Sequence, residues 1–293
     1  MSSLPRQIQD AIETFLSDAG KNKITSAFQP VGGGCINNGG LLSTNVGDLF
    51  VKWNKAGRYP QMFQKEAEGL IILRNAKSIL VPEVILSAQV EDFQFIVLSY
   101  LRPGKRRDDY WRMLAERLAA LHQNTSPTFG LNHDNYIGSL PQSNKQDISW
   151  IGFFTEQRLK AQLKIAGAKI SNDVRKLFDQ LFDKLPSLLP NDEPASLLHG
   201  DLWSGNVLVD ENGEPALIDP AVYYGHREVD LAMTRLFGGF HSDFLDAYHQ
   251  AFPLAPAYEE RFELYNLYPL LVHVNLFGGG YLSQVVQTLK RFI

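Results

Sequence analysis

The segment H-G-D-L-W-S-G-N, residues 199–206, carries the side chains of this chain that are best suited to chemistry. Asp219 follows Asn206 by thirteen residues, beyond two short apolar runs separated by an Asn-Gly turn. Phosphoryl transfer to a hydroxyl requires such a set: one carboxylate orients the attacking hydroxyl, and an amide and a second carboxylate hold Mg²⁺ against nucleotide phosphates. The spacing therefore predicts a phosphoryl-transfer site built on Asp201, Asn206 and Asp219. The alternative is that the two aspartates are turn residues and that Asn206 caps a hairpin.

Three consecutive glycines, Gly32, Gly33 and Gly34, lie between two runs that are expected to be strands. Backbone without Cβ atoms can fold closely over phosphates, so the run is a candidate phosphate loop. An ordinary hairpin turn is the alternative. The run lacks G-x-G-x-x-G spacing and leads to an expected strand, which disfavours a Rossmann site. The pattern G-x-x-x-x-G-K-[ST] occurs nowhere, which excludes a P-loop.

Lys52 and Glu66 are the candidate partners for the phosphates. Lys52 lies within an apolar strand pattern, where a lysine by itself would be expected to face solvent. Glu66 is centred on the apolar side of a predicted helix, with Met62, Phe63, Leu70 and Leu73. A carboxylate at such a position needs a buried partner. We therefore expect a Lys52–Glu66 pair that orients nucleotide phosphates.

The stretch that ends in Ser99-Tyr100-Leu101, followed by Pro103-Gly104, has the pattern of a buried strand that opens into a hinge. Backbone groups of Ser99 and Leu101 could bond to adenine there. An edge strand followed by a turn explains the same pattern.

These residues need a strand-rich part and a helical part to position them. The periodicity predicts strands at 25–31, 41–44, 49–53, 84–88 and 95–101, and helices at 61–76, 107–122, 150–166, 173–185 and from 228 onward. Residues 124–147 are expected to be a loop, and two short strands are expected within 199–218. The chain is thus predicted to be α+β with two lobes, 1–101 and 102–293, and with its ligand between them.

Composition limits the class of protein. The chain has 293 residues, 44% of them hydrophobic and 20% charged, which excludes disorder and allows a sizeable core. A net charge of −4 provides no general attraction for nucleic acid or an anionic membrane. The single cysteine, Cys35, excludes an internal disulfide and a cysteine-built zinc site, and it favours a reducing compartment.

Neither end of the chain has a membrane pattern. The first helical stretch, 7–16, is amphipathic and unlike an export signal. Residues 264–289 contain no Asp, Glu, Lys or Arg, but Pro269 and a glycine run at 278–280 interrupt them. Two buried helices joined by a glycine turn are expected there. We expect a cytoplasmic protein.

At these residues the chain resembles the fructosamine kinase (ketosamine 3-kinase) family, within the aminoglycoside-phosphotransferase-like branch of the protein-kinase-like fold. The matching text is G-G-G-C-I at 32–36, F-V-K at 50–52, M-F-Q-K-E-A at 62–67, H-G-D-L-W-S-G-N at 199–206 and I-D-P-A-V-Y-Y-G-H-R-E-V-D-L-A-M at 218–233. The last stretch, together with Trp203-Ser204-Gly205, favours ketosamine kinases over the antibiotic, choline and homoserine kinases.

The resemblance implies a bilobal fold, with an antiparallel sheet and one main helix in the first lobe and helices in the larger second lobe. It implies that Asp201 is the catalytic base and that Asn206 and Asp219 hold magnesium. Lys52, paired with Glu66, would contact the α- and β-phosphates of ATP beneath the loop of residues 32–34.

Further roles remain open between two interpretations. Trp203 either stacks on a sugar or packs in the core of a lobe, and Arg227 either meets the substrate or is a surface arginine. His199 and Asp230 are expected to support residues 199–206, called the catalytic segment below, although Asp230 could be a simple helix-start carboxylate. Cys35 is either a small loop residue or a redox-active thiol that could bridge two copies of the chain.

The activity implied is ATP-dependent, Mg²⁺-dependent phosphorylation of the sugar 3-hydroxyl in ketosamine adducts, which would serve deglycation repair. The substrate would be a small ketosamine or a glycated protein, with no nucleic acid or membrane partner, and the chain would be a monomer or weak homodimer. The alternatives are a phosphotransferase of the same fold acting on an aminoglycoside or another small alcohol, and a nucleotide-binding protein without catalysis.

Overall fold

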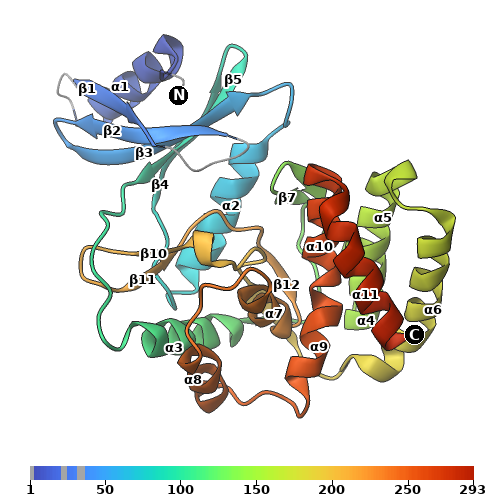
Figure 1. Ribbon diagram of the computed structural model, residues 1–293. Coiled ribbons are helices and arrows are strands. Elements are labelled where there is room, and N and C mark those ends of the chain that lie inside the picture. The colour runs from blue at the N-terminus through green and yellow to red at the C-terminus, as the bar shows by residue number, and fades with distance from the viewer. Residues whose placement is uncertain (1–2, 21–24, 32–36) are drawn as a thin grey trace.

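The first hundred residues of the computed structural model contain an antiparallel sheet with the strand order β1-β2-β3-β5-β4 (Figure 1). The structure describes residues 3–20, 25–31 and 37–293. The elements of this lobe are α1 (Arg6–Gly20), β1 (Ser26–Pro30), β2 (Asn38–Thr44), β3 (Gly47–Lys55), α2 (Met62–Asn75), β4 (Val84–Val90) and β5 (Phe93–Ser99). All five predicted strands and the predicted main helix are present.

Strand alternation assigns the two faces of this sheet to different helices. Leu49, Val51 and Trp53 of β3 pack with Ile8 and Ile12 of α1 in one core. The residues between them point to the opposite face, toward α2, because successive side chains of a strand alternate. Lys52 is therefore on the α2 side of the sheet. This side is buried, so the lysine needs a partner of opposite charge there.

The second lobe is mainly helical. Its helices are α3 (Tyr110–His122), α4 (Trp150–Phe153), a π-helical segment (Phe154–Lys160), α5 (Ala161–Ala166), α6 (Asn172–Leu188), α7 (Glu228–Leu236), α8 (Asp243–Ala251), α9 (Tyr258–Tyr265), α10 (Leu267–Phe277) and α11 (Leu282–Phe292), with short 3₁₀ turns at Gly167–Lys169, Ser204–Asn206 and Gly279–Tyr281. The helix expected at 150–166 is thus interrupted by π-helical turns. Arg158 lies buried in this segment and donates to the carbonyl of Ser143 and to Oδ1 of Asn144.

Short strands lie between the helices. They are β6 (Thr125–Ser126), β7 (Asn135–Ile137), β8 (Leu140–Gln142), β9 (Ala195–Leu198), β10 (Val207–Val209), β11 (Pro215–Leu217) and β12 (Tyr223–Gly225). The β10–β11 hairpin was predicted. The sheet β12-β9-β6 and the β7–β8 hairpin were not, and the latter lies in the stretch expected to be a loop.

The larger hydrophobic core continues from one lobe into the other. Phe63 and Leu70 of α2 and Ile96 of β5 belong to the same cluster of buried side chains as Leu114 of α3. The segment between β5 and α3, where the predicted boundary lies, has no helix or strand. The two lobes are therefore joined by packing as well as by the chain.

The apolar stretch 264–289 forms the two expected helices, α10 and α11, joined by a glycine turn. Helix α10 is mostly buried as expected, whereas α11 buries only Val285, Thr288 and Leu289. Throughout the described ranges, every helix is too short or too polar to cross a membrane.

Candidate active site

The segment from His199 to Asn206 follows strand β9, and hydrogen bonds to the carboxylate of Asp230 on α7 hold its first two residues in place. The two carboxylate oxygens of Asp230 accept the backbone N–H groups of His199 (2.7 Å) and Gly200 (2.9 Å). Gly200 has φ of +84°, and a Cβ there would lie 2.1 Å from the carbonyl oxygen of Ala221. The close approach explains why the position between His199 and Asp201 is a glycine.

His199 is fully buried and joins the segment to the residue before Asp219. Its Nε2 lies 2.9 Å from the carbonyl oxygen of Ile218, and its Nδ1 accepts from the backbone N–H of Asp201. Because a carbonyl only accepts, the proton is on Nε2. Burial lowers the pKa of His199, so the ring is neutral and acts as a structural bridge.

Asp201 and Asn206 are in direct contact. Nδ2 of Asn206 donates to the backbone carbonyl of Asp201 (2.8 Å) and to its Oδ2 (3.2 Å). Burial raises the pKa of Asp201 to about 7, a rise opposed by the Asn206 hydrogen bond and increased by the nearby carboxylates of Asp219 and Asp230. A carboxylate with its pKa near neutrality is a competent acceptor for the proton of an alcohol.

Lys52 joins the two lobes at this point. Its Nζ lies 2.7 Å from Oε1 of Glu66 on α2 and 2.8 Å from Oδ1 of Asp219. Burial acts to lower the pKa of Lys52, but the charges and hydrogen bonds of Asp219 and Glu66 outweigh it and raise the pKa, so the ammonium stays charged. The structure therefore forms the expected Lys52–Glu66 contact and adds Asp219 from 167 residues away.

The oxygen atoms of Asn206 and Asp219 have the chemistry that magnesium prefers. The amide nitrogen of Asn206 is used by Asp201, which leaves Oδ1 as the atom available to a cation. Asp219 has a left-handed φ of +54°, and its side chain is 48% exposed. Mg²⁺ takes few protein oxygens and keeps water or phosphate in its other positions, so this pair fits the ion.

The residues expected to bind adenine lie where β5 leaves the sheet. The backbone N–H of Ser99 already donates to the carbonyl of Glu83 (2.9 Å), and its hydroxyl accepts from the N–H of Glu83. The N–H of Ser99 is thus already used, so of its backbone groups only the carbonyl could bond to adenine, and the expected contact stays a prediction. Leu101 lies in the connection to α3, and its contact with adenine also stays a prediction. Gly32, Gly33, Gly34 and Cys35 lie outside the described residues.

Trp203 lies at the surface of the site, with 40% of its side chain exposed. Its ring covers Gly205, where a Cβ would lie 2.2 Å from the indole. This exposure does not fit packing in the core of a lobe, and stacking on a sugar stays a prediction.

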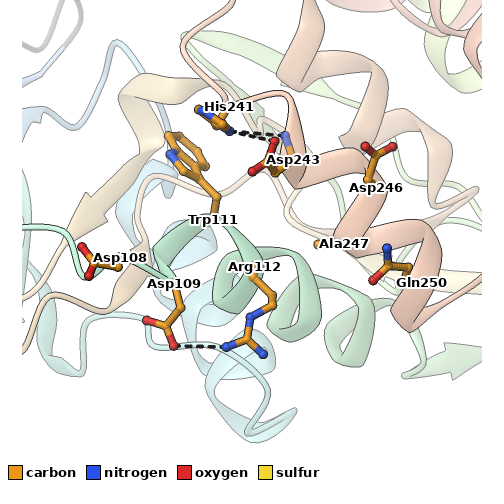
Figure 2. Close-up of a pocket in the computed structure, with 9 residues that line it drawn as sticks. All are labelled: Asp108, Asp109, Trp111, Arg112, His241, Asp243, Asp246, Ala247 and Gln250. Carbon is orange, nitrogen blue, oxygen red and sulfur yellow. Dashed lines mark hydrogen bonds and ion pairs between the residues drawn. The ribbon is translucent and has the colours of Figure 1, made fainter.

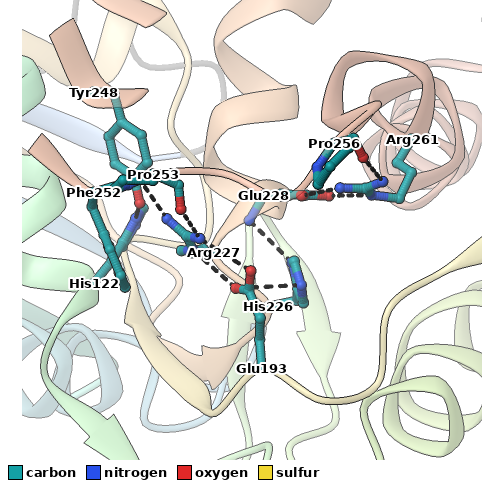
Figure 3. A network of polar contacts seen from close by, with 10 residues as sticks. All are labelled: His122, Glu193, His226, Arg227, Glu228, Tyr248, Phe252, Pro253, Pro256 and Arg261. Atoms are coloured by element: carbon teal, nitrogen blue, oxygen red, sulfur yellow. Dashed lines mark hydrogen bonds and ion pairs between the residues drawn. The ribbon is translucent and has the colours of Figure 1, made fainter. Parts of the chain in front are cut away.

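Arg227 fits neither of its two interpretations, since it is not at the surface and its guanidinium is occupied by other residues, away from this group. It is buried, and its guanidinium donates to both oxygens of Glu193 and to the carbonyls of Phe252 and Pro253 (Figure 3). Four hydrogen bonds leave little capacity for a ligand, so Arg227 holds the connection after α8 in place.

Two further residues support the catalytic segment and were not predicted. Nε2 of His122 lies 3.2 Å from Oδ2 of Asp230, and its Nδ1 lies 2.7 Å from the hydroxyl of Tyr248. Nε2–H therefore donates to the carboxylate, and Nδ1 accepts from the tyrosine. His122 lies on an apolar helix face with nothing in the local sequence to indicate its partner.

Of two hollows in the surface, only the smaller one includes any of these residues. The larger one, about 670 Å³, lies between α3 and α8 and contains none of the residues described above (Figure 2). A much smaller one includes Asp201 and is lined by Ile137, Gly200, Val229, Asp230, Met233, Tyr268 and Pro269. We locate the candidate active site at Asp201, because that is where the chemically matched groups meet.

Comparison with known proteins agrees with this geometry. The family model described as fructosamine kinase matches residues 8–293. A probable ketoamine kinase of Synechocystis sp. is 44% identical over 89% of this chain and 88% of its own. The chloroplastic protein-ribulosamine 3-kinase of Arabidopsis thaliana is 36% identical over 97% and 88%.

Solved structures have the same architecture. A crystal structure assigned to a fructosamine-3-kinase of Haemophilus somnus has a TM-score of 0.86 and 30% identity, and it covers 96% of both chains. The aminoglycoside phosphotransferase APH(4)-Ia, in a ternary complex with AMP-PNP and hygromycin B, has a TM-score of 0.62 at 16% identity over 96% and 98% of the chains, a likeness of fold. This chain, with its bilobal kinase-like fold, belongs to the fructosamine kinase family.

Proposed function

We propose that this protein is an ATP-dependent kinase that phosphorylates the sugar 3-hydroxyl of ketosamines. The observation that carries the proposal is the meeting of Asp201, Asn206, Asp219, Lys52 and Glu66, drawn from four separate parts of the chain. Two relatives, a ketoamine kinase and a ribulosamine 3-kinase, and the AMP-PNP bound by a protein of the same fold support it.

In the proposed reaction, Asp201 takes the proton of the sugar 3-hydroxyl as the oxygen attacks the γ-phosphorus of ATP. The bond between that phosphorus and the bridging oxygen breaks, and ADP leaves with the electron pair. Lys52 stays charged and holds the α- and β-phosphates, while Glu66 fixes its position. Magnesium, held by Asn206 and Asp219, would neutralise charge on the phosphate oxygens.

The product would be a ketosamine 3-phosphate, an unstable adduct that releases the amine. The biological role proposed is thus the repair of glycated amines in the cytoplasm, whether these are small molecules or protein lysines. The position of Trp203 beside Asp201 supports a sugar as the acceptor, since a flat aromatic surface stacks well on a sugar ring.

The test is turnover of MgATP with fructose-lysine, ribulose-lysine and kanamycin as acceptors. With the two ketosamines only, we expect release of ADP and formation of a new phosphate monoester, which ³¹P NMR would detect. Asp201→Asn should lower kcat by about a thousandfold, within the range for loss of a general base, without changing the melting temperature. Turnover with kanamycin alone would reassign the protein to another alcohol acceptor, and turnover with none of the three would contradict the proposal.

A further inference from the structure

A chain of aromatic side chains leads away from the catalytic segment. The ring of Trp203 contacts Phe237 (centroids 6.4 Å apart), and Phe237 contacts His273 (4.8 Å). His273 in turn contacts Phe277 (5.4 Å) and Tyr281 (4.9 Å). We refer to these five residues as the aromatic row. It connects Asp201, two residues before Trp203, with the far end of helix α10.

The aromatic row is open to solvent along much of its length. The exposed fractions are 40% for Trp203, 39% for Phe237 and 57% for Phe277. Single exposed apolar residues are common on soluble proteins, but large ones in mutual contact usually mark a binding surface. The row begins at Trp203, whose backbone N–H contacts the carbonyl of Asp201, the proposed base, and this position points to a subsite of the acceptor.

Two glycine-rich loops hold the row in place. Phe237 precedes Gly238 and Gly239, with φ of +71° and +93°, and Phe277 precedes Gly278, also at +93°. A Cβ at Gly239 would lie 2.6 Å from the side chain of Ser204, so this loop packs directly on the catalytic segment. The second loop joins α10 to α11 at the end of the helical lobe nearer to the sheet lobe (Figure 1).

His273 places one polar atom within the row. Its Nδ1 lies 2.7 Å from the carbonyl oxygen of Pro269, so Nδ1 carries the proton and donates it. Burial lowers the pKa of His273, which keeps the ring neutral. The other nitrogen, Nε2, therefore has a lone pair that can accept a hydrogen bond from a ligand N–H.

These features match the amine end of a ketosamine. In such a molecule a protonated secondary amine joins the first carbon of the sugar to an alkyl chain, so the nitrogen lies between the sugar and the chain. Aromatic faces attract ammonium groups, and they pack well against methylene chains. A neutral imidazole nitrogen can accept one of the ammonium hydrogens.

We infer that the aromatic row beyond Trp203 binds the amine substituent of the ketosamine, while the sugar lies between Trp203 and Asp201. The charged nitrogen lies near Phe237 and His273, and the alkyl chain of the modified lysine lies along Phe277 and Tyr281. This inference rests on the proposed function and adds to it the part of the substrate that sets affinity. Because the row contacts no reacting atom, it acts through KM and leaves kcat unchanged.

The test compares two ketosamines that share the same sugar. One is the fructose adduct of Nα-acetyl-lysine, and the other is 1-amino-1-deoxyfructose, which has the charged nitrogen but no chain. In Phe277→Ala we expect kcat/KM for the lysine adduct to fall about tenfold, through KM, with little change for the unsubstituted compound. Phe237→Ala should lower kcat/KM for both, because it lies closer to the shared nitrogen.

Phe15→Ala, which removes an aromatic of 40% exposure from α1, is the matched control and should change neither value. Equal loss on both substrates in Phe277→Ala, or no loss on either, would overturn the inference while the proposed function stands. If the wild-type protein turns over neither ketosamine, the proposed function fails and the inference with it.

Discussion

At the scale of single residues, Lys52 is the charge on which the site depends. Lys52→Met would leave Glu66, whose side chain is only 12% exposed, without its counter-ion. We expect a loss of about 3 kcal/mol in the free energy of unfolding, measured with urea, because a buried charge without its partner is costly. Adding Glu66→Gln should recover part of the loss.

Lys55→Met is the control for this prediction. Lys55 lies in the same strand, but its side chain is 58% exposed and its nearest carboxylate, on Asp92, is 3.8 Å away. A surface change of this kind should cost less than about 0.5 kcal/mol. Similar losses for the two lysine variants would show that Lys52 does not hold a buried charge.

Gly205 is a second residue with a specific prediction. Its missing Cβ leaves room for the ring of Trp203. Gly205→Ala should displace the indole, which we expect to shift the tryptophan fluorescence and to raise KM for the ketosamine several-fold while KM for ATP stays constant. Gly57→Ala, at a glycine with open space around it, is the matched control. An unchanged KM for the sugar would argue against stacking by Trp203.

At the scale of elements, helices α3, α7 and α8 meet around Asp230. Tyr248→Phe removes only the hydroxyl that donates to His122, leaving a buried Nδ1 without a donor. We expect a cost of about 1–3 kcal/mol in stability, and a lower kcat as His122 holds Asp230 less firmly. Tyr258→Phe, on the partly exposed side of α9, should change neither. A stable variant with normal kcat would show that the contact does not position the catalytic segment.

Elements with a strong local signal could be predicted from the sequence. The apolar side of α2 made Glu66 conspicuous, and the turn residues between Val209 and Pro215 marked the β10–β11 hairpin. Pairings over long sequence distances could not. Strand β9 pairs with both β6 and β12, and nothing in its four residues indicates either partner.

The candidate site divides in the same way. The spacing of Asp201, Asn206 and Asp219 predicted phosphoryl transfer. The burial of Arg227 could not be predicted, because it depends on Glu193 and on the chain after α8, both distant in the sequence. Likewise, the aromatic row draws on the catalytic segment, the end of α7 and the end of α10, so no single window of sequence contains it.

At the scale of the whole molecule, His226 links folding to pH. Burial lowers its pKa to about 4, so its contact with Glu193 at 3.5 Å is not an ion pair at neutral pH. In the unfolded chain, His226 has the ordinary histidine pKa of about 6.5. Below that pH the unfolded chain binds a proton at His226 that the folded chain does not bind. Stability should therefore fall by about 3 kcal/mol from this residue as the pH drops from 7 to 4.

His226→Asn tests this prediction, because the variant has no group that titrates there. The free energy of unfolding of the variant should depend less on pH than that of the wild type, by the same amount. His241→Asn, at an exposed histidine, is the control and should leave the pH dependence as it is. Parallel curves for the wild type and His226→Asn would contradict the prediction.

The core that runs from α2 and β5 into the helices bears on how the protein unfolds. The sheet lobe has its own core against α1, but its other face, toward α2, shares an interior with the helical lobe. If the two lobes shared no interior, heating could melt one before the other. Here, the side chains of Phe63, Ile96 and Leu114 lose their packing together. We therefore expect a single calorimetric transition whose van't Hoff enthalpy equals the measured enthalpy, so that the sheet lobe, expressed alone, would not be a cooperative folding unit.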